Sequence, residues 1–281
     1  MADKPVTNTG TTDLQAAISG WGSVSAGDAV YLGQGSQEFT TNTDLSATDL
    51  SLFHATRGWS GNFDASPLQV LLNRTGTGKL VIESAGRVFR FQSTNTPGVI
   101  EYVESAPQRS DCRVHCSQAN VELFSAVRGI NYIEATGDVN KVEAYQDAEV
   151  TLRATGSYTP AVISSWGSRV NCERDVATVN AFASKDGRQG LVVLGNENAA
   201  AAVSPATIYI DGGYVKLRNI SSVSTKVWGR AGVLDLTELT APVQFADAEL
   251  HPSLTMLVGA IEPTYGTGPS KRYGGATIIR R

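Results

Sequence analysis

The sequence predicts an all-β chain of the right-handed parallel β-helix type with a short capping helix at its N-terminus, and three observations lead to that prediction. Short apolar segments separated by Gly, Asn, Asp, Ser and Thr begin at intervals of roughly 8 to 13 residues, so that two or three fill each stretch of about 20 to 25, as in one coil of a solenoid. No convincing helical periodicity follows Gly22, which excludes a sheet built from βαβ units. Asn-Gly and Asp-Gly hairpin signals are scarce, so antiparallel pairing has little support.

The composition of the chain is consistent with one such domain, and it argues against nucleic acid as a partner and against a membrane span. A chain of 281 residues commonly forms a single unit when it is all-β. Charged residues make up 18%, below the roughly 25% usual for soluble domains, and 28 glycines suit many short strands and tight turns. The net charge of −4 without a basic block disfavours nucleic acid as a partner. The apolar runs are a few residues long against the roughly 20 needed to cross a bilayer, so no membrane span is expected.

The elements follow in order along the chain. Residues 1–10 are polar and predict a flexible leader without the apolar region of a signal peptide, so we expect folding in a cytosol. Residues 11–20 predict the capping helix, because apolar residues recur at helical spacing between a capping Thr and Gly20. Ala26-Gly27-Asp28 then turns the chain into a strand at 29–32. Further strands are predicted at 68–72, 80–82, 88–91, 99–103, 112–116, 121–124, 130–133, 139–145, 149–152, 161–163, 170–172, 191–194, 207–210, 214–217, 223–228 and 233–236.

Residues 11–262 are therefore expected to form one β-helix domain that the helix closes. The end of a solenoid exposes apolar core and unpaired backbone groups, and the candidates for covering them are Leu14, Ala17, Ile18 and Trp21. Leu14, Ile18 and Trp21 are also candidates for docking on a partner. A helix packed on the side of a β-sandwich is the alternative, since strand spacing alone does not distinguish the two folds. The sequence Asp211-Gly212-Gly213 between TIYI and YVKL fits a corner as well as a hairpin.

The last segment, residues 263–281, is rich in Gly and Pro and predicts an extended arm. Its residues 276–279 could add as a strand to another subunit, with a frayed, solvated terminus as the alternative. The docking candidates in this arm are basic, aromatic or aliphatic: Lys271, Arg272, Tyr273, Ile278, Ile279, Arg280 and Arg281.

A second candidate surface is a predicted loop over residues 53–59. Phe53, Arg57 and Trp59 combine two aromatic rings with a guanidinium group, which suits stacking on a surface glycan or anchoring a protein contact. Packing of these side chains within the protein is the alternative.

No residue pattern predicts a catalytic site, a cofactor or a metal ion. The acidic groups within 138–149 and 235–249 do not recur at a coil interval and are interpreted as solvated turns. Arg169–Asp175 is the one compact mixture of basic and acidic residues and is interpreted as a salt-bridged surface. Cys112 and Cys116 flank His115, but in a strand residues four apart lie about 13 Å from each other and cannot share one ion without a sharp bend.

The opening TTDLQAAISGWGSVSAGDAVYL, residues 11–32, resembles the start of pectin-lyase-like right-handed β-helix domains, in which a short helix closes the first coil and a Gly-Asp turn begins the first strand. The resemblance covers these 22 residues closely and the later coils only by pattern. Many such domains belong to virion proteins of tailed phages, among them capsid decorations, fibres and tailspikes. The resemblance therefore implies a virion protein that contacts capsid or tail proteins and forms a homo-oligomer, by the habit of the family a homotrimer.

Two functions follow from this interpretation. The first is a non-enzymatic virion structural protein, a capsid decoration or a short fibre or attachment component, made in the host cytoplasm. The alternative is a polysaccharide-degrading enzyme, a depolymerase or lyase like those of tailspikes, with its cleft between coils or between subunits. A fold alone does not decide between them.

Overall fold

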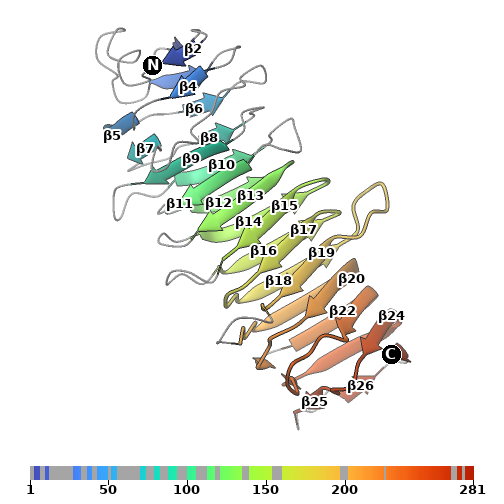
Figure 1. Cartoon of the computed structure of the whole chain (residues 1–281). Helices are drawn as coiled ribbons and strands as arrows, with labels where there is room; N and C mark the ends of the chain where they lie inside the picture. Colours follow the sequence, from blue (N-terminus) through green and yellow to red (C-terminus); the bar gives the residue numbers. More distant parts are fainter. Residues whose placement is uncertain are drawn as a thin grey trace. The chain divides into compact units, whose positions relative to one another are not determined.

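The structure is a computed structural model that describes residues 28–32, 121–133, 139–153, 160–196, 202–224, 226–266 and 276–281 with their side chains, and the backbone of the remaining strands named below. Every regular element in this described part is a β-strand (Figure 1). The chain divides into two compact units, the first comprising residues 1–140 and 155–158, the second 141–154 and 159–281.

Unit 1 consists of short parallel strands, most of which pair with a strand that comes about one coil later. Ala29 of β3 is in register with Leu52 of β6, 23 positions on, and Leu52 with Lys79 of β8, 27 positions on. A second series runs from β5 through β7 and β9 to β11 and β13. The strands are β1 (Asp3–Val6), β2 (Gly10–Thr12), β3 (Ala29–Leu32), β4 (Gln37–Phe39), β5 (Thr43–Asp49), β6 (Leu52–Ala55), β7 (Val70–Asn73), β8 (Lys79–Ile82), β9 (Val88–Ser93), β10 (Ile100–Ser105), β11 (Arg113–Ser117), β12 (Val121–Ala126) and β13 (Ile130–Glu134).

Unit 2 repeats this arrangement with parallel strands on three sides. What we call the first face is formed by β14, β16, β18, the first halves of β20, β22 and β24, and β26. The second face is formed by β15, β17, β19, the second halves of the same long strands, and β27. The two-residue strands β21, β23 and β25 pair on a short third side.

The bounds of these strands are β14 (Val139–Tyr145), β15 (Glu149–Leu152), β16 (Val162–Trp166), β17 (Arg169–Cys172), β18 (Thr178–Phe182), β19 (Leu191–Leu194), β20 (Thr207–Leu217), β21 (Ser222–Val223), β22 (Lys226–Leu236), β23 (Gln244–Phe245), β24 (Ala248–Val258), β25 (Thr264–Tyr265), β26 (Lys271–Tyr273) and β27 (Thr277–Arg280).

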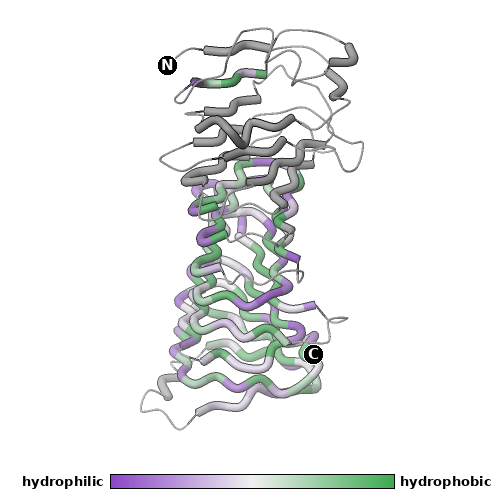
Figure 2. Tube along the Cα trace, turned by 90° about the vertical axis from the view of Figure 1, so that its left-hand side faces the viewer, coloured by the Kyte–Doolittle hydropathy of each residue, from purple (hydrophilic) through white to green (hydrophobic). Residues whose placement is uncertain are grey.

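The core of unit 2 is a set of aliphatic columns that run from coil to coil. Because successive side chains of a strand point to opposite faces, every second residue is directed inward and meets its register partner in the next coil. One column on the first face has no exposed surface and contains Val142, Ile163, Val179, Ile208 and Val227. Burial of each such side chain stabilises the fold by about 1.5 to 3 kcal/mol. Hydrophobic and hydrophilic residues alternate along these coils in Figure 2.

The corner between the first and second faces depends on glycine. β20 bends at Asp211–Gly213, where its register with β22 shifts, so this sequence forms a corner and not a hairpin. In the next coil Gly232 has a φ of +105°, and a Cβ atom there would lie 2.1 Å from the carbonyl oxygen of Gly213. Only glycine fits at such a position.

Aromatic side chains form one outward-facing row in the first three coils of unit 2. Tyr145, Trp166 and Phe182 are register partners on β14, β16 and β18. The rings of Tyr145 and Trp166 are stacked with centroids 4.8 Å apart, and those of Trp166 and Phe182 with centroids 5.4 Å apart. Such stacks add to the backbone hydrogen bonds that hold neighbouring coils together.

These observations confirm the predicted fold at the level of a β-solenoid of stacked parallel strands, and they contradict the β-sandwich alternative. The predicted helix over 11–20 is not seen in the described residues: Gly10–Thr12 form strand β2, and residues 13–20 lie outside them. The predicted leader, residues 1–10, contains β1, which pairs with β3. The predicted arm, residues 263–281, contains β25, β26 and β27, which pair with β23 and β24 of the same chain.

Candidate functional site

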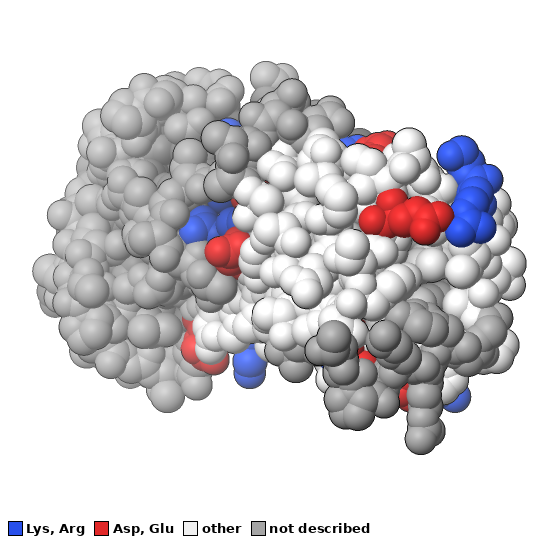
Figure 3. All heavy atoms as spheres, turned by 90° about the horizontal axis from the view of Figure 1, so that it is seen from below, with Lys and Arg blue, Asp and Glu red and all other residues white. Residues whose placement is uncertain are grey.

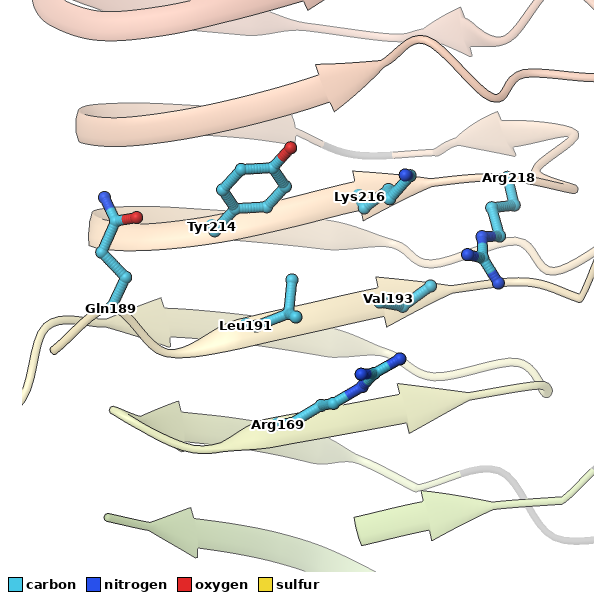
Figure 4. Close-up of a pocket in the computed structure, with 7 residues that line it drawn as sticks. All are labelled: Arg169, Gln189, Leu191, Val193, Tyr214, Lys216 and Arg218. Carbon is cyan, nitrogen blue, oxygen red and sulfur yellow. The ribbon is translucent and has the colours of Figure 1, made fainter. Parts of the chain in front are cut away.

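A pocket of about 350 Å³ lies on the second face of unit 2, over strands β17, β19 and β20 (Figure 4). These strands are neighbours in the sheet, and alternation along each of them directs one residue in two outward. The pocket is lined by Arg169, Gln189, Leu191, Val193, Tyr214, Lys216 and Arg218.

The pocket combines an apolar floor with a basic rim. Leu191 and Val193 on the middle strand β19 form the floor, and Val193 is only 4% exposed. Arg169 rises from β17 on one side, and on the other side Lys216 rises from the end of β20 and Arg218 from the position directly after it. Figure 4 shows the guanidinium groups of the two arginines directed toward each other over Val193.

Two acidic residues from the next coil hold the side chains of Lys216 and Arg218 in place. Glu238 accepts hydrogen bonds from Nζ of Lys216 and from Nε of Arg218, the latter at 2.7 Å. Asp235, which is in register with Lys216, has an oxygen 3.8 Å from its Nζ atom. The hydrogen bond from Lys216 is the main reason why the pKa of Glu238 lies below its ordinary value.

Asp235 is the most buried of the acidic residues around the pocket, at 3% exposed. Its Oδ1 atom accepts hydrogen bonds from the backbone N–H of Thr237 at 2.9 Å and from its hydroxyl at 2.6 Å, and its other oxygen accepts one from the hydroxyl of Tyr214. Burial raises the pKa of Asp235, but these hydrogen bonds and the charge of Lys216 outweigh it, so that the net pKa is lowered.

The pKa of Tyr214 shifts upward, and the same hydrogen bond with Asp235 contributes to the shift. Burial, together with the hydrogen bond to the Asp235 carboxylate, raises the pKa of the Tyr214 phenol to about 12. Its hydroxyl therefore keeps its proton and acts as a donor near neutral pH.

Arg169 is the more accessible of the two arginines, with 51% of its side chain exposed. Its Nε atom lies 3.3 Å from Oδ1 of Asn171 and 3.9 Å from a carboxylate oxygen of Glu149. These contacts hold the base of the guanidinium group and leave its outer edge directed over the floor of the pocket (Figure 4).

Charge elsewhere on the described surface is mixed. In the view of Figure 3, basic and acidic groups are small, separated by uncharged surface, and mostly lie beside groups of the opposite sign. In the part of the chain that the structure describes, no group of His, Cys, Asp and Glu is arranged to hold a metal ion. The same residues include no helix of the length and apolar character that a membrane crossing requires.

The residues singled out from the sequence fall in several places. Ile278 and Ile279 lie on β27 and are 52% and 41% exposed, while Arg280 on the same strand pairs with Glu262 at 2.9 Å. The backbone N–H of Arg281 donates to the carbonyl oxygen of Val258. Lys271, Arg272 and Tyr273 form β26, beside the first half of β24.

The remaining candidates belong to unit 1 or lie outside the described residues. Phe53 lies in strand β6, in register with Val30 and Leu80, whereas the sequence suggested a loop. Arg57 and Trp59 of that predicted recognition loop lie outside the described residues, as do Leu14, Ile18 and Trp21 of the predicted cap.

The pocket itself was not predicted, although part of it stood out in the sequence. Arg169 begins the compact mixed-charge segment 169–175, and Asp235 and Glu238 belong to an acidic group that was interpreted as solvated turns. Tyr214, Lys216 and Arg218 alternate with apolar residues, a period-two signal that marks one exposed side of a strand. That signal could have identified the basic rim of the pocket.

Comparisons of this chain with protein-family models, with curated proteins and with solved structures find no match.

Proposed function

We propose that this chain is a non-enzymatic structural protein of a virus particle. More particularly, we propose a capsid decoration or a short fibre or attachment component of a tailed phage, made in the host cytoplasm and located in the virion. The stacked coils of parallel strands support this proposal, because each coil buries the aliphatic side chains of its neighbours in a stiff body suited to a mechanical role. The resemblance of residues 11–32 to pectin-lyase-like β-helix domains, many of which belong to virion proteins of tailed phages, supports it as well.

The observation that favours binding over catalysis is the ionisation of Tyr214 in the pocket and of the two carboxylates, Asp235 and Glu238, that hold the pocket side chains. General acid and base catalysts work best with a pKa near the working pH. Here the pKa values of Asp235 and Glu238 are lowered, which favours their carboxylate forms, and that of Tyr214 is raised to about 12, which favours its protonated form. Each shift moves the pKa of the group away from neutral pH. Such groups orient neighbours and ligands more readily than they exchange protons.

Several finer features belong to this proposal. They are a right-handed coil, a capping helix over residues 11–20, docking of the chain ends on other virion proteins, a homotrimer, and contact of Phe53, Arg57 and Trp59 with a surface glycan. A right-handed coil agrees with the strong preference of parallel strand connections for that hand.

The second candidate function is degradation of a polysaccharide. It is favoured by the pocket, which places cationic Arg169, Lys216 and Arg218 around an exposed depression on the side of the solenoid. A lyase that removes a proton beside a sugar carboxylate needs positive charge of this kind.

One pair of experiments distinguishes the two. We expect electron microscopy of assembled particles to show density for the protein on the capsid or tail, and incubation with a panel of bacterial polysaccharides to release no reducing ends or unsaturated products. Product release that disappears in Arg169→Gln or Lys216→Gln would establish the enzyme instead.

A further inference from the structure

The two pocket arginines, Arg169 and Arg218, are each held through Nε, and their terminal Nη groups are left to bind a ligand. Within the described residues, the hydrogen bonds of Arg169 and Arg218 use only their Nε atoms, to Asn171 and Glu238 respectively. Their Nη atoms have no hydrogen-bond partner there, and Figure 4 shows both groups turned toward the space over Val193. A guanidinium group fixed at Nε presents its remaining N–H groups in one plane and in a defined direction.

Planar donors of this kind match a carboxylate. The two oxygens of a carboxylate accept parallel hydrogen bonds from a guanidinium edge, and a second guanidinium on the opposite side can share the same group. Lys216 contributes less to an incoming anion, because its ammonium group is already bonded to Glu238 and lies close to Asp235.

The floor of the pocket restricts what the carboxylate is attached to. Leu191 is partly exposed and offers apolar surface, and Val193 beside it is almost fully buried, so the floor presents no hydrogen-bonding side chain. Such a floor suits an aliphatic neighbour better than a sugar ring with several hydroxyl groups to satisfy. At one side of the pocket, the side-chain amide of Gln189 has no hydrogen-bond partner among the described residues and can donate to and accept from a peptide backbone.

We propose that this pocket binds an acidic side chain, flanked by aliphatic residues, of a partner polypeptide. Arg169 and Arg218 hold the carboxylate between them, and the partly exposed Leu191 contacts the neighbouring aliphatic groups. The inference rests on the geometry of the pocket and not on the proposed virion function, so each can fail without the other.

The test uses the full chain and two capped tripeptides, acetyl-Leu-Glu-Leu-amide and its matched neutral analogue acetyl-Leu-Gln-Leu-amide, titrated by ligand-observed NMR. We expect the acidic peptide to bind with a Kd on the order of 1 mM, as for a small ligand with few contacts. Its affinity should fall at least about 5-fold between low salt and 0.5 M NaCl, because the arginines are partly exposed and salt screens them. The neutral peptide should bind at least about 10-fold more weakly.

Three variants assign the binding to the pocket. Arg169→Gln and Arg218→Gln should each weaken the acidic peptide at least about 5-fold. Arg230→Gln is the matched control, because Arg230 is an exposed arginine of the same unit that pairs with Asp211 outside the pocket, and it should leave the affinity unchanged. Circular dichroism and the thermal midpoint establish that each variant is folded.

Unchanged affinity in both pocket variants would refute the proposal, as would equal binding of the two peptides. A galacturonate oligomer that competes for the pocket more strongly than the acidic peptide would also overturn it, because it would assign the site to acidic sugars.

Discussion

Gly232 and Gly187 both have positive φ angles, but their surroundings differ. At Gly232 a methyl group would meet the backbone of the neighbouring coil, with the oxygen of Gly213 at 2.1 Å, whereas at Gly187, where φ is +82°, nothing lies within 4 Å. We expect Gly232→Ala to reduce the free energy of unfolding by more than about 3 kcal/mol, because the coils must separate, and Gly187→Ala to cost about 1 kcal/mol for the backbone alone. Urea unfolding of both variants measures the difference. Equal losses would contradict the close approach of the coils.

Asp235 makes a prediction about pH. Its pKa is lowered in the folded protein, so its interactions stabilise the fold at pH values above its ordinary pKa of about 3.9 and are lost as the pH falls through the lower folded value. We expect Asp235→Asn to lower stability by about 2 kcal/mol at pH 7, since hydrogen bonds to a charged group are lost. The difference from the wild type should shrink below about pH 4. Urea unfolding of both proteins at pH 7 and pH 3 checks this. If Asp235→Asn costs the same stability at both pH values, the charge of Asp235 does not account for the loss.

Among the elements, the turn from β14 to β15 has a glutamine at a position with positive φ, where the corresponding turn of the next coil has a glycine. Gln146 has a φ of +50°, and its N–H donates to the carbonyl oxygen of Trp166, directly before Gly167 with a φ of +68°. A residue with a side chain is strained by about 1 to 2 kcal/mol in this conformation, and glycine is not. Because glycine also gains freedom in the unfolded chain, we expect Gln146→Gly to stabilise the protein by a net amount of up to about 1 kcal/mol. A lower midpoint of chemical unfolding would show that the Gln146 side chain contributes more than the strain costs.

The predicted and observed strands agree best where aliphatic residues dominate. Leu191–Leu194 was predicted as a strand and is β19, with three of its four residues buried. Thr178–Phe182 was not predicted, because Thr, Asn and a small Ala interrupt its apolar pattern, yet it pairs with β16 and β20 as β18. The neighbouring coils supply the partner strands, so tertiary pairing outweighs the weak local preference here.

At the scale of the whole molecule, the strand spacing predicted a solenoid but not the site. The residues of the pocket come from three successive coils, and which residues become neighbours depends on the length of each coil. Val162 pairs with Thr178 after 16 positions, but Thr178 pairs with Thr207 after 29. A register cannot be calculated from an average repeat when the coils differ this much, so Arg169, Leu191 and Tyr214 could not be aligned from sequence alone.

Stability should also vary along unit 2. Strands such as β16 and β18 pair on both sides, whereas β27 pairs with β24, and all four of its side chains are exposed. Amides in a strand with fewer buried contacts open more often. We expect hydrogen exchange, followed by mass spectrometry, to be at least about 10-fold faster for residues 277–280 than for residues 162–166. Equal protection would mean that another chain covers β27 in solution.

The unequal coils have a practical consequence. The step from Thr178 to Thr207 carries 13 more residues than the step before it, while Val179 and Ile208 remain paired and fully buried in the same core column. Additional length is thus taken up where the chain turns, and lengthening a loop carries only a small entropic cost. A foreign peptide grafted between Asp186 and Gly187, in a turn of this step whose residues 185–189 are exposed, should therefore be displayed on the outside without disturbing the stack, so the protein can serve as a scaffold for presenting epitopes.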